Sequence, residues 1–194
     1  MLGRAPRCVL VGGARSGKTS IWLAVIAREP GGTVTVARDH RRPVRMAVTD
    51  IPRAGGGAEP VAARLRRPWL MGLGPWVIDT PSLPDGEEPL AGTGRAAAAT
   101  LTLALEADAV LHVWDAAAMG GGAASSPLDD ELARWGRRRP GYWILAAKMD
   151  AGPAQTGLMR IGERYPDVRL IPVAAATGRG IQALRRALRS AARR

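Results

Sequence analysis

The chain has 194 residues, enough for one hydrophobic core and too few for two ordinary domains. It has 28 Lys and Arg against 17 Asp and Glu, a net charge of +11, while hydrophobic residues make up 46% of it. This hydrophobic share excludes a disordered basic tail, so we expect the charge to lie on a folded body. Only two of the basic residues are lysines, Lys18 and Lys148, and the excess of arginine indicates compositional pressure on the whole chain.

No segment has the pattern of a membrane span or a secretory leader. The longest apolar stretch, residues 96–105, falls well short of the roughly 20 residues that a membrane-spanning helix needs. The N-terminal residues run directly into an apolar strand and a glycine-rich turn, without a charged leader and cleavage site. The single Cys8 offers no intramolecular disulfide. We therefore expect a cytoplasmic protein without a transmembrane segment.

Short apolar runs alternate with longer amphipathic or alanine-rich segments, which is typical of an α/β sheet. Apolar runs without polar alternation predict strands buried on both faces at 8–12, 75–79, 109–115, 142–148 and 169–173. The other segments predict helices at 17–28, 95–107, 127–137, 155–165 and 180–192. Ser126 before Pro127 marks the start of one of them. The expected fold is a three-layer α/β/α fold, with helices on both faces of a mostly parallel sheet of about six strands.

Residues 31–74 do not repeat this alternation. Two strands are expected there, at 33–37 and 44–51, followed by a segment at 52–60 that is rich in proline and glycine. We predict a single domain over residues 1–194 with a mobile or inserted segment around 31–74.

The strongest functional signal is the sequence GGARSGKT at 12–19, a full match to the phosphate-binding pattern GxxxxGK[ST]. It follows an apolar strand and precedes an amphipathic helix, as the P-loop requires, so backbone N–H groups and the helix start can bind phosphate. Lys18 is expected to reach the β- and γ-phosphates, and Thr19 to offer its hydroxyl to Mg²⁺. The predicted nucleotide-binding residues are Gly13, Ala14, Arg15, Ser16, Gly17, Lys18, Thr19 and Ser20.

A second signal is the sequence WVIDTPS at 76–82. Asp79 stands at the end of an apolar strand, where a carboxylate lies beside the phosphate loop and can hold a magnesium-bound water. A third signal is the sequence AKMD at 147–150, which ends another apolar strand and contains the second lysine.

In motif order and spacing, the chain resembles the Era-like branch of Ras-type (TRAFAC class) small P-loop GTPases over nearly its whole length. The resemblance implies that Lys148 and Asp150 recognise guanine, as the family's N-K-x-D motif does. It also implies that residues 172–181 match the family's S-A-x-x-G loop, with the backbone N–H of Ala175 at the guanine O6. The predicted base-loop residues are Ala174, Ala175 and Ala176.

Several residues depart from the family pattern. Ala147 stands where the family has Asn, and the lost hydrogen bond predicts weakened guanine selectivity. Ser82 replaces a Gly whose N–H meets the γ-phosphate, and Leu83 cannot orient a water, so intrinsic turnover is expected to be slow. Arg15 is a candidate for an internal cation against the phosphates, or a solvent-facing arginine. The predicted catalytic residues are Lys18, Arg15 and Ser82.

The predicted magnesium site consists of Thr19, Thr33 and Asp79. Thr33 follows Pro-Gly-Gly and resembles the P-G-T segment of Era-like proteins, although Thr35 lies at a similar distance and both could be ordinary strand residues.

The resemblance and the motifs together predict a small GTP-binding protein that hydrolyses GTP slowly with Mg²⁺ and acts as a nucleotide-dependent switch for an unidentified protein or RNA effector. The alternative is a non-catalytic P-loop scaffold that binds GTP or GDP and recruits RNA, the ribosome or a protein partner. The arginine run at 137–139 is compatible with contacts to phosphate and equally with a solvated surface.

Overall fold

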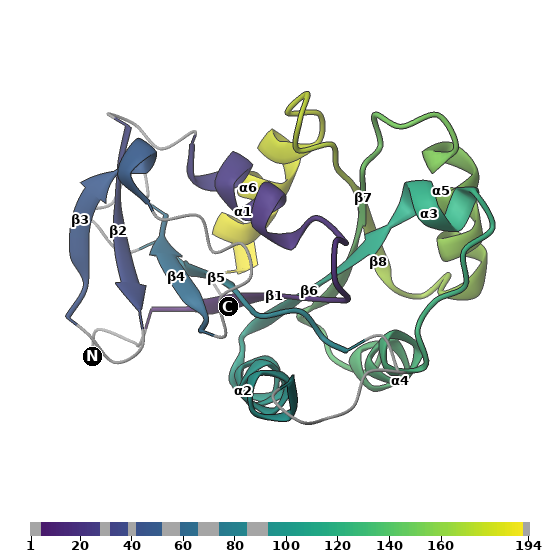
Figure 1. The fold of residues 1–194 in the computed structure, drawn as a ribbon, viewed down its shortest axis with the longest axis horizontal. Coiled ribbons are helices and arrows are strands. Elements are labelled where there is room, and N and C mark those ends of the chain that lie inside the picture. The colour runs from purple at the N-terminus through teal and green to yellow at the C-terminus, as the bar shows by residue number, and fades with distance from the viewer. Residues whose placement is uncertain are drawn as a thin grey trace.

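The structure is a computed structural model that describes residues 5–27, 32–38, 42–51, 59–65, 74–84 and 93–191. The strands are β1 (Arg7–Val11), β2 (Thr33–Arg38), β3 (Val44–Ala47), β4 (Val61–Arg64), β5 (Trp76–Asp79), β6 (Ala109–Asp115), β7 (Tyr142–Ala147) and β8 (Arg169–Pro172). The helices are α1 (Lys18–Ile26), α2 (Thr93–Glu106), α3 (Ala116–Gly120), α4 (Pro127–Gly136), α5 (Ala154–Arg164) and α6 (Ile181–Ala191), with a short 3-10 helix, η2, at Val48–Asp50. Within the described residues, one eight-stranded sheet has the order β3-β2-β4-β5-β1-β6-β7-β8 (Figure 1).

The five strands predicted from apolar runs form the parallel part of the sheet. β1 pairs in parallel with β5 on one side and with β6 on the other, and β7 and β8 continue beyond β6. The predicted ends of these strands differ from the observed ends by no more than one residue. All residues of β7 and nearly all of β6 are buried, which is why these strands show no polar alternation.

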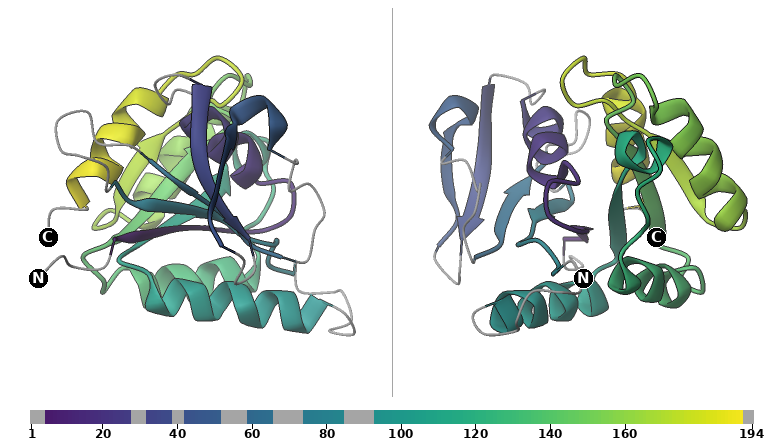
Figure 2. Two further views of the ribbon diagram at one scale, coloured as in Figure 1. Left: turned by 90° about the vertical axis from the view of Figure 1, so that its left-hand side faces the viewer. Right: turned by 45° about the vertical axis from the view of Figure 1, so that its right-hand side comes forward.

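Helices cover both faces of the sheet. Successive side chains of β1 point to opposite faces, so β1 packs against both helix layers. Cys8 and Leu10 pack in one hydrophobic cluster with side chains of α1 and α6. Val9 and Val11 pack in another, with side chains of α2, α4 and α5. The expected three-layer α/β/α fold is confirmed, and Figure 2 shows the helices on the two sides of the sheet. None of the helices in the described residues combines the length and the apolar character that a bilayer crossing requires.

The antiparallel half of the sheet corrects the prediction of about six strands. The sequence does not predict β4, which pairs antiparallel with both β2 and β5 and joins the β2–β3 hairpin to the rest. Its sequence, VAAR, has a single β-branched residue, so partners on both sides define the strand rather than local propensity. The strand predicted at 44–51 is also shorter, because β3 ends at Ala47 and η2 follows. Residues 52–58 and 66–73 of the segment predicted to be mobile or inserted lie outside the described residues.

α3 is a short helix that the sequence does not predict, and it packs very closely against α5. The carboxylate of Asp115 caps it by accepting a hydrogen bond from the backbone N–H of Ala118 at 3.0 Å. A Cβ atom built on Gly157 of α5 would lie 1.9 Å from the carbonyl oxygen of Ala116. The two backbones therefore approach to a distance that only glycine permits at residue 157.

The variant Gly157→Ala is expected to destabilise the fold. Overpacking of this kind costs about 1–3 kcal/mol of unfolding free energy, more than the gain of up to about 1 kcal/mol from the helix propensity of alanine. Gly162→Ala in the same helix is the matched control, since the nearest atom to a Cβ there, a methyl carbon of Leu170, is 3.7 Å away. Urea unfolding compares the two variants. Equal stability of the two would contradict the close packing of α3 on α5.

Candidate functional site

The loop between β1 and α1 wraps back over the end of the sheet because two of its glycines adopt left-handed backbone angles. Gly12 has φ 145° and Gly17 has φ 105°, and α1 begins at the next residue, Lys18. A Cβ atom on Gly12 would lie 2.5 Å from the carbonyl oxygen of Val113 in β6. The loop thus lies directly against the sheet, with the N-terminus of α1 at its end.

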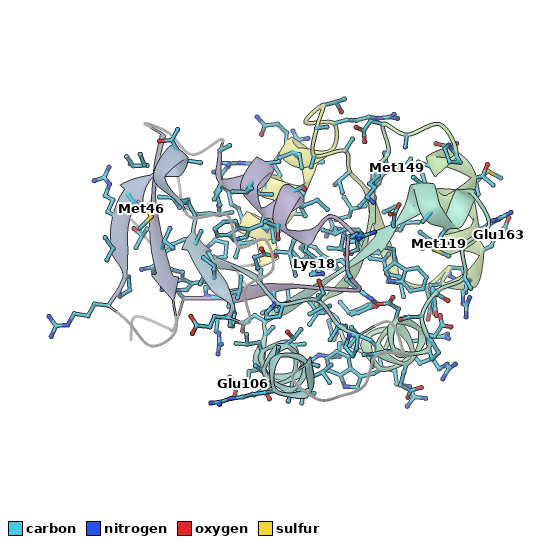
Figure 3. All side chains as sticks on the ribbon, in the orientation of Figure 1. Lys18, Met46, Glu106, Met119, Met149 and Glu163 are labelled. Carbon is cyan, nitrogen blue, oxygen red and sulfur yellow. The ribbon has the colours of Figure 1, made fainter. Side chains whose placement is uncertain are left out.

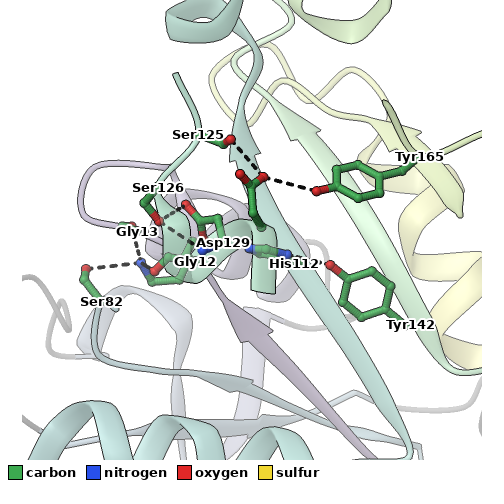
Figure 4. A network of polar contacts seen from close by, with 11 residues as sticks. Gly12, Gly13, Ser82, His112, Ser125, Ser126, Asp129, Tyr142 and Tyr165 are labelled. Carbon is green, nitrogen blue, oxygen red and sulfur yellow. Dashed lines mark hydrogen bonds and ion pairs between the residues drawn. The ribbon is translucent and has the colours of Figure 1, made fainter. Parts of the chain in front are cut away.

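The side chain of Lys18, the first residue of α1, is buried and extends back into the loop (Figure 3). Its Nζ donates hydrogen bonds to the carbonyl oxygens of Gly12 and Gly13, at 2.8 and 2.7 Å, and to Oγ of Ser82, at 3.1 Å (Figure 4). A buried ammonium needs such partners because burial without them is strongly unfavourable. The contact with Ser82 brings two of the predicted catalytic residues together.

Asp79 and Thr19 meet at the start of α1. Thr19 Oγ1 donates a hydrogen bond to Asp79 Oδ2 at 2.7 Å, while Asp79 Oδ1 is buried and has no hydrogen-bond partner among the described residues. Burial raises the pKa of the Asp79 carboxyl to about 6, although the hydrogen bond from Thr19 and the charge of Lys18 oppose the rise. A hydroxyl and a buried carboxylate with one unused oxygen are ligands that fit Mg²⁺ or its bound water.

The segment after β5 is attached directly to the loop. The backbone N–H of Leu83 donates to the carbonyl oxygen of Gly12 at 3.0 Å, which forms a parallel bridge between Leu83 and Gly13. The Leu83 side chain is buried in the hydrophobic cluster with α2 and α4, whereas Ser82 is exposed. Leu83 therefore contributes to packing, and Ser82 is the residue that faces Lys18.

A small hollow of about 140 Å³ lies beside the same loop. It brings together residues that are far apart in sequence: Gly17, Ser20, Ile21, Ala147, Lys148, Asp150, Ala175 and Ala176. The loops after β7 and β8 are joined by a hydrogen bond from the N–H of Met149 to the carbonyl oxygen of Val173, at 3.2 Å. Residues of the AKMD sequence, Ala175 and Ala176 thus form one pocket with the end of the phosphate loop, whereas the predicted base-loop residue Ala174 is buried in the core.

Two side chains define the wall of this pocket next to β6 and the loop. Lys148 has a left-handed φ of 60°, and its Nζ forms an ion pair with Asp115 at the end of β6, at 2.5 Å. Ala147 is buried, and a Cβ atom on Gly17 would lie 3.6 Å from its Cβ. Ala147 therefore lies next to Gly17 of the phosphate loop, and its match to the Asn of the Era-like motif stays a prediction.

Thr33 is not brought to this site by any contact in the described residues. It begins β2, which β4 and β5 separate from β1, and its hydroxyl accepts hydrogen bonds from Arg45 Nε and Nη2 at 3.3 and 3.0 Å. Its role as a magnesium ligand stays a prediction. Arg15 lies in the loop, exposed and with a left-handed φ of 57°.

A buried polar network next to the loop is not predicted by the sequence. His112 Nδ1 lies 2.6 Å from the hydroxyl of Tyr142, and its Nε2 lies 2.8 Å from Asp129 Oδ1 (Figure 4). Ser126, the N-cap of α4, donates to the other carboxylate oxygen of Asp129 at 2.9 Å. Asp129 and Gly13 of the loop both line a hollow of about 390 Å³. Since the partners come from different elements, no local pattern signals this network.

No family model and no curated protein matches the chain. The G domain of the T. maritima FeoB iron transporter has TM-score 0.58 at 16% identity, over 97% of this chain and 99% of that chain. An S. thermophilus NFeoB mutant bound to GDP has TM-score 0.60 at 16% identity, over 96% and 61%. A GTP-binding protein from Sulfolobus solfataricus in complex with GDP has TM-score 0.56 at 17% identity, over 97% and 52%.

The chain has the G-domain fold. The chain covers 99% of the G domain of T. maritima FeoB but only 61% of the S. thermophilus chain. The hollow of about 140 Å³ and the Thr19–Asp79 contact both lie at the carboxyl ends of the parallel strands. Ligands bind at this edge in sheets of this kind.

Asp79→Asn is expected to remove one component of the pH dependence of stability. Because the folded-state pKa of Asp79 is raised to about 6, protonation stabilises the folded chain at low pH, and this stabilisation is lost as the pH rises through 6. The variant keeps an acceptor for Thr19 without the buried charge. It should gain stability relative to wild type, by up to about 3 kcal/mol, between about pH 4 and pH 7. Urea unfolding in metal-free buffer measures this gain, and a gain that does not change with pH would contradict the raised pKa.

Proposed function

We propose that the chain is a small GTP-binding protein of the Era-like type that hydrolyses GTP slowly with Mg²⁺ and acts as a nucleotide-dependent switch in the cytoplasm. The observation that supports this most is the continuity of the site around Gly17. This residue ends the phosphate loop and also lines the pocket that holds Asp150 and Lys148. One nucleotide can therefore contact both parts at once.

The phosphate end of the nucleotide is assigned to the loop and Lys18. Backbone N–H groups of residues 13–19 and the N-terminus of α1 supply hydrogen-bond donors and partial positive charge. Lys18 is already oriented by the Gly12 and Gly13 carbonyl oxygens, so little rearrangement is needed for its charge to act on the β- and γ-phosphates. Its bond to Ser82 is the one that a γ-phosphate oxygen would replace.

Magnesium is assigned to Thr19 and Asp79. The Thr19 hydroxyl would bind the ion directly, and the unpartnered Oδ1 of Asp79 would accept a hydrogen bond from a water on it. Bound there, Mg²⁺ neutralises charge on the β- and γ-phosphate oxygens. Thr33 would have to reach this position from β2 to complete the site.

The base is assigned to the hollow of about 140 Å³. A carboxylate accepts two hydrogen bonds, so Asp150 matches the N1 and N2 hydrogens of guanine, whereas adenine presents an acceptor at N1. The backbone N–H of Ala175 is assigned to O6. GDP is bound by two of the structural neighbours, which supports guanine here.

Hydrolysis requires a water in line with the γ-phosphate and positive charge around it. Lys18 supplies positive charge from inside the loop. Arg15 is exposed on the loop, where its guanidinium can approach the phosphates. Because Leu83 is apolar and buried, its side chain does not orient the water at this position. Slow intrinsic turnover follows, and an unidentified protein or RNA effector would read the nucleotide state.

The alternative, a nucleotide-binding scaffold without hydrolysis, is favoured by one contact. The Ser82 hydroxyl accepts a hydrogen bond from Lys18, so the segment after β5 can rest on the loop without a γ-phosphate. Such a protein would bind GTP and GDP and recruit RNA, the ribosome or a protein partner without turnover.

Lys18→Ala separates these two functions. Wild type is expected to release phosphate from GTP over multiple turnovers with Mg²⁺ and not with EDTA, and the variant to lose this release, because no other buried cation lies under the loop in the described residues. Arg134→Ala, an exposed change on α4, is the control. Binding of GTP by wild type without any Lys18-dependent phosphate release would favour the scaffold.

Asp150→Asn tests the assignment of the base. An asparagine replaces one acceptor by a donor, so GDP affinity is expected to fall about tenfold or more. Affinity for xanthosine diphosphate, which has an oxygen in place of the guanine amino group, is expected to rise relative to GDP. Titration with GDP, ADP and xanthosine diphosphate measures both changes. An unchanged order of affinities would show that Asp150 does not read the base.

A further inference from the structure

A third hollow, larger than the two beside the phosphate loop, lies at the opposite edge of the sheet. Its volume is about 570 Å³, and its lining residues include Arg138, Arg139, Arg169 and Trp143. Arg169 begins β8 and Trp143 lies near the start of β7, while the two other arginines precede β7. The hollow is thus at the amino ends of the parallel strands, whereas the nucleotide site is at their carboxyl ends.

Two of the three guanidinium groups are available for a ligand. The guanidinium of Arg139 is engaged within the protein, because its Nη2 donates hydrogen bonds to the carbonyl oxygens of Leu105 and Ala107, both at 3.3 Å. Arg138 and Arg169 are exposed and form no hydrogen bond or ion pair within the described part of the chain. The guanidinium of Arg169 lies over the ring of Trp143, with Cζ 4.6 Å from the ring centroid, and this contact restricts its motion.

Carboxylates do not neutralise this hollow. Asp108 is the carboxylate that lines it among the described residues, and its Oδ2 accepts a hydrogen bond from the backbone N–H of Arg7 at 2.7 Å. Asp167 lies outside the lining residues and pairs with Arg137 at 3.0 Å. Three guanidinium groups against one carboxylate leave a net positive charge at the walls.

We propose that this hollow binds a compact ligand that carries phosphate groups. Guanidinium groups match phosphate oxygens in planar, two-bond geometry, and an oriented arginine loses less entropy on binding. The volume falls in the range of about 300–1,000 Å³ that is typical of small-molecule sites. A concave wall favours a small phosphorylated molecule over the extended backbone of a nucleic acid. The proposal does not depend on the nucleotide site, because no residue is shared between them.

The test uses inorganic tripolyphosphate as the probe, measured by calorimetry at low salt. The full chain with Lys18→Ala is measured beside wild type. Tripolyphosphate binding that is lost in this variant is binding to the phosphate loop. In both backgrounds, Arg138→Gln with Arg169→Gln is expected to weaken the remaining binding at least about tenfold. Arg95→Gln with Arg134→Gln removes the same charge from exposed positions outside the hollow and should change the affinity less than about twofold.

The proposal is overturned if the Arg138 and Arg169 changes leave tripolyphosphate affinity unaltered, or if the control pair weakens it equally. It is also overturned if a short single-stranded RNA loses affinity with these changes while tripolyphosphate does not, because the surface would then recognise nucleic acid. GDP affinity of the Arg138→Gln and Arg169→Gln variant should equal that of wild type. Failure of GDP to bind any variant would count against the proposed function only.

Discussion

The buried ammonium of Lys18 is the interaction on which the rest of the site depends. A charge in the interior must be surrounded by acceptors, and two carbonyl oxygens of the loop serve this purpose at 2.8 and 2.7 Å. With these carbonyls turned inward to the lysine, peptide N–H groups of the loop are left for a ligand. The left-handed angles of Gly12 and Gly17 make that curvature possible, and between them Arg15 also has a left-handed φ, of 57°.

The sheet then determines what surrounds the loop. Because β5 and β6 flank β1, the last residues of these two strands, Asp79 and Asp115, lie on either side of it. Asp79 meets Thr19 at the start of α1, and Asp115 pairs with Lys148 at the pocket wall. Parallel strands with helices on both faces thus bring three distant sequence motifs to one edge.

The sequence predicts those parts of the fold and site whose signals are local. Buried strands appear as continuous apolar runs, and the phosphate loop and the Ser126 cap each lie within a few residues. Features that depend on distant partners are not predictable in this way. β4 has weak strand propensity and is defined by its neighbours, and His112 finds Tyr142 and Asp129 only after folding. The prediction for Thr33 rests on its position after Pro-Gly-Gly alone, and within the described residues its hydroxyl contacts Arg45.

The carbonyl oxygen of Gly12 accepts hydrogen bonds from both Lys18 Nζ and the backbone N–H of Leu83. One oxygen thus belongs at the same time to the ligand-binding loop and to the segment that follows β5. If a ligand at the loop changes the free energy of detaching Leu83, then linkage requires the converse with the same magnitude. If the ligand favours detachment, a partner that prefers the detached segment binds the ligand-loaded chain more tightly, and by the same factor it strengthens ligand binding. Under that condition, partner affinity and ligand affinity would both measure one coupling free energy, transmitted through the carbonyl oxygen of Gly12.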